Sequence, residues 1–543
     1  MIHPARNARC SACSRLRLRV PPAWTRLLLA FLLPACLGRA APAGAPAPGR
    51  VLDGQQLVQR LYEAGPPAPH WLDRNGEPAR FVLQLLGMAH LHGLRAADYS
   101  AEELARRFER LAGPDDAAAF ERALSAAMLQ FLADLHFGRA GNAYRPYPVS
   151  IGEFDPVEAL RQAMATGRVP EAIDAAAPGI PMYRRVMATL ARYRDLARQH
   201  PDWPALTSVR TSPVRIGDDY DGTPLLRERL RLLGDLDAPA SARDDSKLAY
   251  TPELAAAVAR FQARHGLEED GVLGAETAAA LSVPLTERVA QLELTLERLR
   301  WIPPQRKGRI IVINVPSYRL WAVDTREPAG LPLEMRVIVG KAAQTPTPLF
   351  IGQMRYLEFN PYWNVPPSIL AGEVLPALAR DSDYLRKHDM EVVAATGAIL
   401  SGGSGAAFSA LRSGTARVRQ RPGARNVLGG IKFAMPNPMN IYLHSTSTQE
   451  LFDRTRRDLS HGCIRVERPA ELAAFVLADP GRWDAERVAV AMLDGRTRRI
   501  DLREAVPVVL FYATAASDRQ GRALFARDIY KQDAPLIQAL QAR

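Results

Sequence analysis

Ser460-His461-Gly462-Cys463-Ile464-Arg465-Val466 is the heptapeptide on which the interpretation of this chain depends, and its cysteine follows His444 by nineteen residues. A thiol is a weak nucleophile until it ionises, and a neighbouring imidazole can take its proton. A cysteine close to two histidines therefore predicts a chemical role for the thiol rather than a role in core packing.

The N-terminus predicts export. Residues 1–43 contain seven arginines and no acidic residue, and they include an apolar run at 27–37. A basic segment, a short apolar segment and the small residues Ala41-Pro42-Ala43 follow the order of a secretory signal peptide. We therefore expect a signal peptide at 1–43 and a flexible tether at 44–50. Cleavage would leave Cys463 as the only one of the four cysteines in the mature chain.

Cys36 supports a second interpretation of the N-terminus. Leu33-Pro34-Ala35-Cys36 resembles an imperfect lipobox, in which Cys36 would carry a lipid and tether the protein to a membrane. A retained membrane anchor is less favoured, because a helix that spans the bilayer needs roughly 20 apolar residues.

Charge and size restrict the class of protein. Loss of the seven N-terminal arginines from a formal net charge of +12 leaves +5, so the mature chain is only mildly basic. It has no basic run interleaved with aromatic residues, which disfavours nucleic-acid binding. A hydrophobic content of 47% over 543 residues is enough for several cores, and the length suggests roughly three domains.

The first half of the chain has helical periodicity. Apolar residues recur every three or four positions over 51–215, which predicts a helical scaffold domain. Residues 220–284 predict three short helices, with Thr251 as an N-cap and a turn at Asp270-Gly271. Residues 285–304 are expected to return to the scaffold as a helix.

The three-helix region also carries a motif. The segment Ala257-Val258-Ala259-Arg260-Phe261-Gln262, together with Asp270-Gly271 and Thr277, resembles the three-helix type of peptidoglycan-binding module. That resemblance implies a peptidoglycan-binding domain at 220–284.

The periodicity changes after residue 305. Short β-branched or aromatic runs bounded by Gly, Pro and Asn predict a mostly β domain at 305–530 and a C-terminal tail at 531–543. The expected strands are 310–313, 318–323, 335–339, 356–359, 440–444, 488–490 and 508–512. A long, less regular insertion at 368–425 more often covers a site than fills space.

Alternation along the strands predicts which side chains share a face. Tyr442 and His444 point to the same side of their strand, away from their apolar neighbours. If 463–466 is extended, Cys463 and Arg465 also share a face. We expect His444 to act as the base for Cys463.

The surroundings of the nucleophile suggest the remaining roles. The ring of His444 would be oriented by a backbone carbonyl or by Ser445. The small residue Gly462 lets backbone amides approach a ligand, so the N–H groups of Gly462 and Cys463 would form an oxyanion hole. His461 would shape or polarise that pocket.

Other roles at this face are less specific. Arg465 is a candidate for binding a substrate carboxylate, with a structural ion pair as the alternative, and Tyr442 is a pocket wall or simple packing. His444, His461 and Cys463 are three possible zinc ligands, but no second cysteine or carboxylate pattern completes the set. We therefore expect neither a metal nor a cofactor. A redox role is disfavoured because no resolving cysteine survives processing.

The histidine and cysteine motifs together resemble a known family. Ile441-Tyr442-Leu443-His444, followed at this separation by Ser460-His461-Gly462-Cys463-Ile464-Arg465-Val466, resembles the L,D-transpeptidase catalytic domain of bacterial cell-wall enzymes. The resemblance extends to Gly340-Lys341, Thr345-Pro346-Thr347-Pro348, 359–369, Arg419-Gln420, Pro422-Gly423, Asn426, Leu428-Gly429, Lys432-Phe433 and Pro436-Asn437.

The match is to the large periplasmic branch of that family. Its members combine a helical scaffold, a peptidoglycan-binding module and a mostly β catalytic domain, so the resemblance implies a multidomain α+β fold with 368–425 as a capping insertion. Large relatives often have Asp after the histidine, where this chain has Ser445.

The resemblance implies a ping-pong acyl transfer. Cys463 would attack the carbonyl between the third and fourth residues of a tetrapeptide stem, release D-Ala and keep a thioester. The side-chain amine of a second stem would then form a 3→3 cross-link. The implied partners are peptidoglycan stems and glycan strands in the periplasm, and carbapenems would acylate the cysteine.

Two other functions stay open. Water could release the same thioester, which would make the protein an L,D-carboxypeptidase. The module at 220–284 could instead supply the whole function, as in a non-catalytic wall-binding protein. A binder has no need of Cys463, His444 and Gly462 together, which argues against the second alternative.

Overall fold

The computed structural model describes residues 54–542 except 64–70, 148–153, 207–208, 210–211, 238–247, 305, 328–329 and 403. The expected signal peptide at 1–43, the tether at 44–50 and the lipid site at Cys36 lie outside the described residues. Within the described ranges, no helix is long and apolar enough to cross a membrane.

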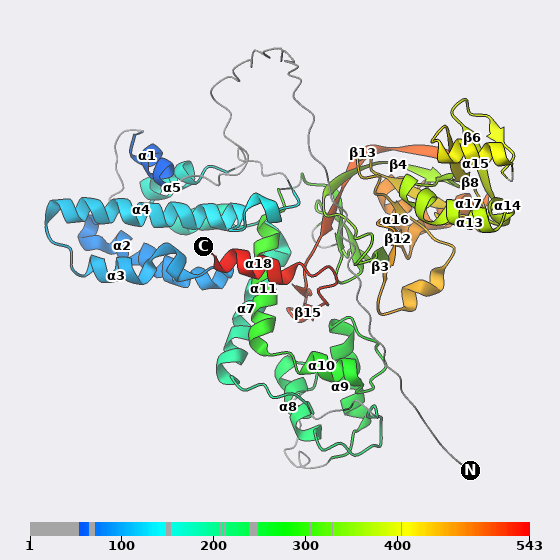
Figure 1. The fold of residues 1–543 in the computed structure, drawn as a ribbon. Helices are drawn as coiled ribbons and strands as arrows, with labels where there is room; N and C mark the ends of the chain where they lie inside the picture. Colours follow the sequence, from blue (N-terminus) through cyan, green and yellow to red (C-terminus); the bar gives the residue numbers. More distant parts are fainter. Residues whose placement is uncertain are drawn as a thin grey trace, which may run out of the picture. The chain divides into compact units, whose positions relative to one another are not determined.

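The first half of the chain is helical, as expected (Figure 1). Its elements are α1 (Gly54–Glu63), α2 (Asp73–Gly87), η1 (Met88–His92), η2 (Ala96–Tyr99), α3 (Ala101–Phe108), α4 (Gly113–Phe137), η3 (Asn142–Tyr144), α5 (Pro156–Thr166), α6 (Val169–Ala176) and α7 (Pro181–Gln199). The longest, α4, begins with a proline and two aspartates in its first turn, residues that favour a helix start. The apolar faces share one core, in which Phe120, Leu129 and Tyr183 are fully buried.

Three helices follow, as the sequence predicts: α8 (Thr223–Leu233), α9 (Pro252–Arg264) and α10 (Ala275–Leu281). Gln262 joins the segments of the resemblance motif. Its buried side-chain amide donates to Asp270 Oδ1 (2.9 Å) and Thr277 Oγ1 (3.1 Å), and its carbonyl accepts from the Gly271 N–H (2.9 Å). Asp270, Gly271 and Thr277 of the motif are therefore the residues that satisfy the buried side-chain amide of Gln262.

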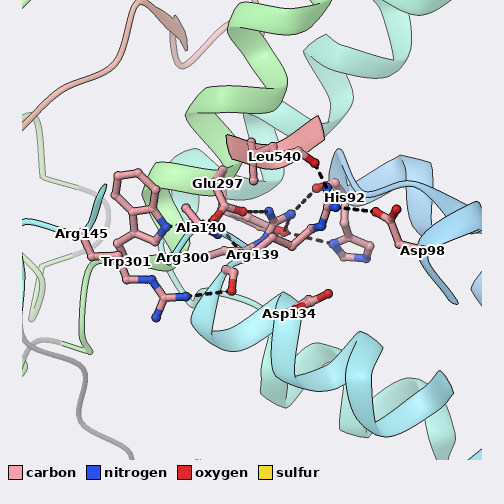
Figure 2. A network of polar contacts seen from close by, with 12 residues as sticks. His92, Asp98, Asp134, Arg139, Ala140, Arg145, Glu297, Arg300, Trp301 and Leu540 are labelled. Atoms are coloured by element: carbon pink, nitrogen blue, oxygen red, sulfur yellow. Dashed lines mark hydrogen bonds and ion pairs between the residues drawn. The ribbon is translucent and has the colours of Figure 1, made fainter. Parts of the chain in front are cut away.

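Helix α11 (Leu285–Arg300) returns to the scaffold and packs along α7. Figure 2 shows the buried polar cluster that holds its C-terminal end. The Glu297 carboxylate accepts from the N–H groups of Arg139 (2.7 Å) and Ala140 (2.8 Å), and it pairs with Arg300 at 3.0 Å. Arg139 also donates to the carbonyl of Leu540 (3.1 Å), near the end of the chain.

The second half of the chain forms a nine-stranded sheet in the order β11-β3-β12-β10-β9-β4-β13-β1-β2. Its strands are β1 (Arg309–Asn314), β2 (Arg319–Asp324), β3 (Leu333–Gly340), β4 (Ile351–Phe359), β9 (Ile431–Ala434), β10 (Leu443–His444), β11 (Asp458–Ser460), β12 (Ile464–Val466) and β13 (Arg498–Phe511). Because β3 pairs with both β12 and β2, the sheet closes on itself around an apolar core.

Two helices and a short turn complete this domain: η6 (Gln449–Asp453), α16 (Pro469–Leu477) and α17 (Ala485–Leu493). The strand expected at 488–490 is wrong, because these residues lie in α17. Asp484 caps the helix by accepting from the Arg487 N–H (2.8 Å). Val488 is buried while Val490 is exposed. In a strand these two side chains would lie on the same face, so the pattern of burial is that of a helix. The N-cap residue Asp484 was the sequence signal for this helix, but the β-branched Val488 and Val490 favoured a strand.

The insertion, expected to be less regular than the strands around it, is an ordered α/β unit with its own core. It contains α12 (Pro367–Ile369), η5 (Leu370–Val374), α13 (Leu375–Arg380), α14 (Tyr384–Lys387), α15 (Gly405–Arg412) and the strands β5 (Trp363–Asn364), β6 (Met390–Ala394), β7 (Ile399–Leu400) and β8 (Ala416–Gln420). Their sheet has the order β5-β8-β6-β7. Since β5 precedes residue 368, the cap includes Trp363.

The end of the chain belongs to the helical core. The strands β14 (Ala515–Ser517) and β15 (Ala523–Phe525) form a hairpin, and the segment expected as a tail carries α18 (Asp533–Gln541). Figure 1 shows α18 (red) beside α11 (green), where Arg298 and Asp533 pair at 2.6 Å. Thr295 Oγ1 also donates to the carbonyl of Ala515 (2.8 Å). Contacts between residues so far apart in the chain leave no pattern in the local sequence from which they could be predicted.

The Glu297 cluster gives a stability test. The side chains of Glu297 and Arg300 are 2% and 0% exposed, so Glu297→Ala would remove the carboxylate partner of a buried guanidinium and the acceptor of two main-chain amides. Removing one partner of a buried pair costs about 3–5 kcal/mol. We expect denaturant unfolding of the helical part to show a loss of this size.

Glu287→Ala is the matched control, because Glu287 is an exposed residue of the first turn of the same helix. Its variant should stay within about 0.5 kcal/mol of the wild type. Equal effects of the two substitutions would contradict the assignment of Glu297 as the central residue of the cluster.

Candidate active site

The Cys463 loop lies over the end of β3. On one side Ser460 of β11 pairs with Gly340 of β3, and on the other Arg465 of β12 pairs with Ile338. A Cβ on Gly340 would lie 2.0 Å from the Thr345 carbonyl oxygen, so only glycine fits there. The connecting residue Gly462 has φ +111°, a backbone conformation that other residues rarely adopt.

Hydroxyl groups fix the conformation of this loop. Ser460 Oγ donates to the Cys463 carbonyl (2.6 Å) and accepts from the Gly462 N–H (3.1 Å). Thr347 Oγ1 donates to the Gly462 carbonyl (2.8 Å) and accepts from the Gly340 N–H (2.8 Å). Thr347 therefore has a structural role within the Thr345-Pro346-Thr347-Pro348 motif, a role that was not evident from the sequence alone.

These bonds bear on the expected oxyanion hole. The Gly462 amide is already engaged by Ser460 Oγ in this conformation. Among the described residues, the Cys463 N–H has no recorded acceptor. Within the described ranges the Cys463 amide is therefore the one of the two expected donors that has no acceptor, whereas the Gly462 amide is engaged.

Strands β10 and β12 run parallel, with Leu443 opposite Ile464 and His444 opposite Arg465. Leu443 and Ile464 are fully buried in the barrel core. Because side chains alternate along a strand, His444 and Arg465 point to the opposite face of the sheet. Tyr442, just before β10, packs against the core of the insertion and against the His444 ring, so the shared side predicted for Tyr442 and His444 is confirmed. Cys463 lies just before β12, outside the extended segment, and packs against the barrel core.

His444 is buried, and a main-chain carbonyl orients its ring. Nδ1 lies 2.6 Å from the Ser445 carbonyl oxygen, an arrangement that places the proton of the neutral ring on Nδ1 and leaves Nε2 as the basic atom. The Ser445 hydroxyl donates instead to the Leu428 carbonyl (2.9 Å). Burial, with a smaller contribution from Arg465, lowers the pKa of His444 to about 3.

The Cys463 thiol faces other partners. Sγ lies 3.6 Å from the Asn440 carbonyl oxygen and contacts the Tyr442 hydroxyl. Among the contacts recorded for the described residues, none joins Sγ to His444. The register explains this, since Cys463 is level with Tyr442 and diagonal to His444, a spacing that side chains can bridge. Burial raises the pKa of the Cys463 thiol, so it rests in the neutral form.

Arg465 and Tyr442 flank Cys463. The Nε of Arg465 is buried without a hydrogen-bond partner, and no carboxylate in the described part of the chain pairs with its guanidinium. The structure therefore does not show the alternative ion pair. The Tyr442 hydroxyl bonds to Cys463 and to the side chain of Trp363 in the cap, and burial raises the pKa of Tyr442 far above its usual range.

His461 points to the cap. Its Nε2 lies 2.6 Å from Oε1 of Glu373, which lies in the η5 turn of the insertion. Both side chains are partly exposed, so the pair contributes little stability by itself. Glu373, Trp363 and Asn437 are residues that the sequence analysis did not assign. Asn437 follows Pro436 in a turn and bonds to the carbonyl of Ile441 (2.7 Å), just before β10.

The zinc hypothesis is not supported by this geometry. His461 Nε2 is directed to Glu373 and His444 Nδ1 to a carbonyl, so the three candidate ligands do not converge. No group of three or more His, Cys, Asp or Glu residues in the described ranges is arranged to hold a metal ion.

Comparisons with known proteins match three parts of the chain to known families. Family models match an L,D-transpeptidase catalytic domain at 308–498, a scaffold domain at 56–190 and a "Putative peptidoglycan binding domain" at 221–281. A curated protein of Haemophilus influenzae, named "Putative L,D-transpeptidase", is 34% identical over 243 residues, which are 45% of this chain and 48% of the relative. The chain thus spans about half the length of that relative.

Two solved structures are also similar. An L,D-transpeptidase of Stackebrandtia nassauensis is 13% identical, with 56% of this chain and 97% of that chain covered and a TM-score of 0.23. One of Xylanimonas cellulosilytica is 17% identical, with 56% and 100% covered and a TM-score of 0.17. These scores are too low to carry an argument.

The family matches agree with the motifs. The matched catalytic range contains His444 and Cys463, and the matched module contains Gln262 with its bonded partners. The chain therefore carries a catalytic domain of the L,D-transpeptidase family, together with a scaffold domain and a peptidoglycan-binding domain.

Proposed function

We propose that this protein forms 3→3 peptidoglycan cross-links by cysteine acyl transfer from tetrapeptide donor stems, with release of D-Ala. The observation that carries the proposal is the shared face of β10 and β12. It presents an oriented neutral imidazole opposite a guanidinium whose Nε has no partner, and the thiol of Cys463 lies one residue before β12, within reach of this face once its side chain rotates.

Acylation begins with rotation of the Cys463 side chain from Asn440 toward His444. Nε2 of His444 takes the thiol proton while Sγ attacks the carbonyl carbon of the third stem residue. The tetrahedral oxyanion accepts a hydrogen bond from the Cys463 N–H, and one such donor contributes roughly 10²–10³-fold to the rate. When the intermediate collapses, His444 gives the proton to the departing amine of D-Ala and the thioester remains.

Deacylation reverses these roles. The side-chain amine of a second stem attacks the thioester carbonyl, His444 removes the amine proton, and Cys463 leaves as a thiol after taking that proton back. Water in place of the amine would give hydrolysis and a tripeptide. We propose that the cap, which contacts the site through Trp363 and Glu373, limits the access of water during this step.

Domains that act on peptidoglycan indicate an extracytoplasmic location. We propose the periplasm, reached through the signal peptide expected at 1–43. Lipidation at Cys36 is the alternative outcome of processing, and intact mass of the mature protein distinguishes the two. The same acyl chemistry implies acylation by carbapenems at Cys463.

The first prediction concerns the nucleophile. Wild-type protein mixed with a disaccharide-tetrapeptide should gain the mass of the disaccharide-tripeptide minus one water on the peptide that contains Cys463, because a thioester forms there as D-Ala leaves. Cys463→Ala should gain none. Intact-mass and peptide-mass spectrometry make the measurement, and cross-linking at full rate by Cys463→Ala would exclude this mechanism.

A second prediction concerns Arg465. If its guanidinium binds the terminal carboxylate of the donor, Arg465→Gln should raise the KM for the donor by about 10- to 100-fold, as expected for loss of a charge-assisted hydrogen bond. Arg468→Gln is the matched control, because Arg468 is a partly exposed neighbour that pairs with Glu471.

A donor with a C-terminal amide sharpens this test. Without the carboxylate, wild type and Arg465→Gln should have similar KM values. An undiminished difference between them on the amide would show that Arg465 does not recognise the carboxylate.

A third prediction concerns pH. Because the pKa of His444 is lowered to about 3, its ring stays neutral and able to accept a proton throughout the range from pH 5 to 8. The single-turnover acylation rate should therefore show no acidic limb near the ordinary histidine pKa of about 6.5. A limb with its midpoint there would indicate that His444 is protonated at rest.

The same shift predicts a stability effect. The folded-state pKa of His444 lies below the unfolded value of about 6.5, so the stabilisation from the neutral ring is complete above that pH and is lost as the pH falls toward 3. His444→Gln should reduce this acid-dependent loss. Denaturant midpoints at pH 7.5 and pH 4.5 measure it, and an equal drop in both proteins would contradict the assignment.

A further inference from the structure

Lys432 lies beside the proposed site without a role in the steps above. It is on β9, opposite Glu358 of β4 and opposite His444 of β10. Its neighbours Ile431 and Phe433 are fully buried in the barrel core. Alternation therefore places Lys432 on the same face as Tyr442 and His444.

The contacts of Lys432 connect it, through Tyr442, to the proposed nucleophile Cys463. Nζ lies 3.1 Å from Glu358 Oε2 and 4.7 Å from the centroid of the Tyr442 ring. The Tyr442 hydroxyl in turn bonds to the Cys463 thiol. A continuous path thus crosses four neighbouring strands, from Glu358 on β4 through β9 and β10 to Cys463 at the start of β12.

The side chain of Lys432 is only 21% exposed, although lysine is seldom buried. An ammonium over an aromatic face is attracted by the ring quadrupole, and the attraction grows when water is excluded. This contact therefore fixes the position of the ring, and with it the position of the phenol.

We propose that Lys432 is a positioning residue for the nucleophile, acting through Tyr442, whose hydroxyl it holds against the Cys463 sulfur so that the thiolate is favoured. The inference rests on the role of Cys463 proposed above. In the transfer step the thiol proton still goes to Nε2 of His444, and Lys432 exchanges no proton.

Other charged or titratable groups also face the sulfur or its neighbours. They are Glu358 on β4, His444 on β10, Arg465 on β12, His461 in the loop and Glu373 in the cap. A test must therefore separate Lys432 from the general charge of the site.

The test is the pH dependence of Cys463 alkylation by iodoacetamide. The full chain is used, and peptide mass spectrometry measures the label on the Cys463 peptide alone. Lys432→Met keeps the length of the side chain but removes its charge. We expect the midpoint of alkylation to rise by about half a unit to one unit, since a nearby cation favours the thiolate.

Two variants serve as comparisons. Lys432→Arg keeps both the charge and the contact with the ring and should restore the wild-type midpoint. Lys387→Met is the matched control, because Lys387 is an exposed lysine of α14 that pairs with Asp381. An unchanged midpoint in Lys432→Met, or an equal rise in Lys387→Met, would overturn the inference.

A double-mutant cycle tests the route through the tyrosine. In a Tyr442→Phe background the hydroxyl contact is absent, so Lys432→Met should shift the midpoint much less than it does with Tyr442 present. An equal shift in both backgrounds would show that Lys432 acts on the thiolate directly and would refute the positioning role.

Glu358→Gln keeps the test valid if Lys432→Met does not fold. It removes the carboxylate that neutralises Lys432 and leaves the cation over the ring, so the midpoint should fall. A midpoint that stays or rises would contradict the proposal. Alkylation needs no turnover, so this inference can fail while Cys463→Ala still abolishes transfer, and the proposed function can fail while alkylation responds to Lys432.

Discussion

The site depends on one constraint, the register of the parallel pair β10 and β12. Leu443 and Ile464 are fully buried in the barrel core, and their burial fixes the register on both strands. A slip by one residue on β10 would turn His444 into the core and Leu443 toward the substrate. Core packing therefore places the imidazole of His444 and the guanidinium of Arg465 on one face, with Cys463 directly before β12.

Desolvation dominates the electrostatics of that face. It lowers the pKa of His444 to about 3 and raises the pKa of the Cys463 thiol, although hydrogen bonds from Tyr442 oppose the second effect. Two neutral partners at rest favour a general-base mechanism over a preformed ion pair. The Ser445 carbonyl then matters more than its hydroxyl, because it fixes which ring nitrogen is basic.

The sequence predicted the features that leave local patterns. Alternation predicted the shared face of Tyr442 and His444, and helical spacing predicted the scaffold and the three-helix module. The strand at 488–490 was wrong because β-branched residues outweighed the cap at Asp484. The α18 packing and the contact of Glu373 with His461 could not be predicted, because both join segments distant in the chain. Likewise, the bond of the Gly462 amide to Ser460 Oγ depends on loop geometry rather than on residue type.

In the proposed function, the thioester on Cys463 passes to an amine rather than to water. Its partition can be measured directly: donor tetrapeptide is mixed with rising concentrations of an isotopically labelled tripeptide stem, which can only accept, and the products are quantified by mass spectrometry. We expect labelled 3→3 dimers that rise with acceptor concentration while free tripeptide made from the donor falls. Release of tripeptide alone at every acceptor concentration would contradict this proposal and would assign the protein as an L,D-carboxypeptidase.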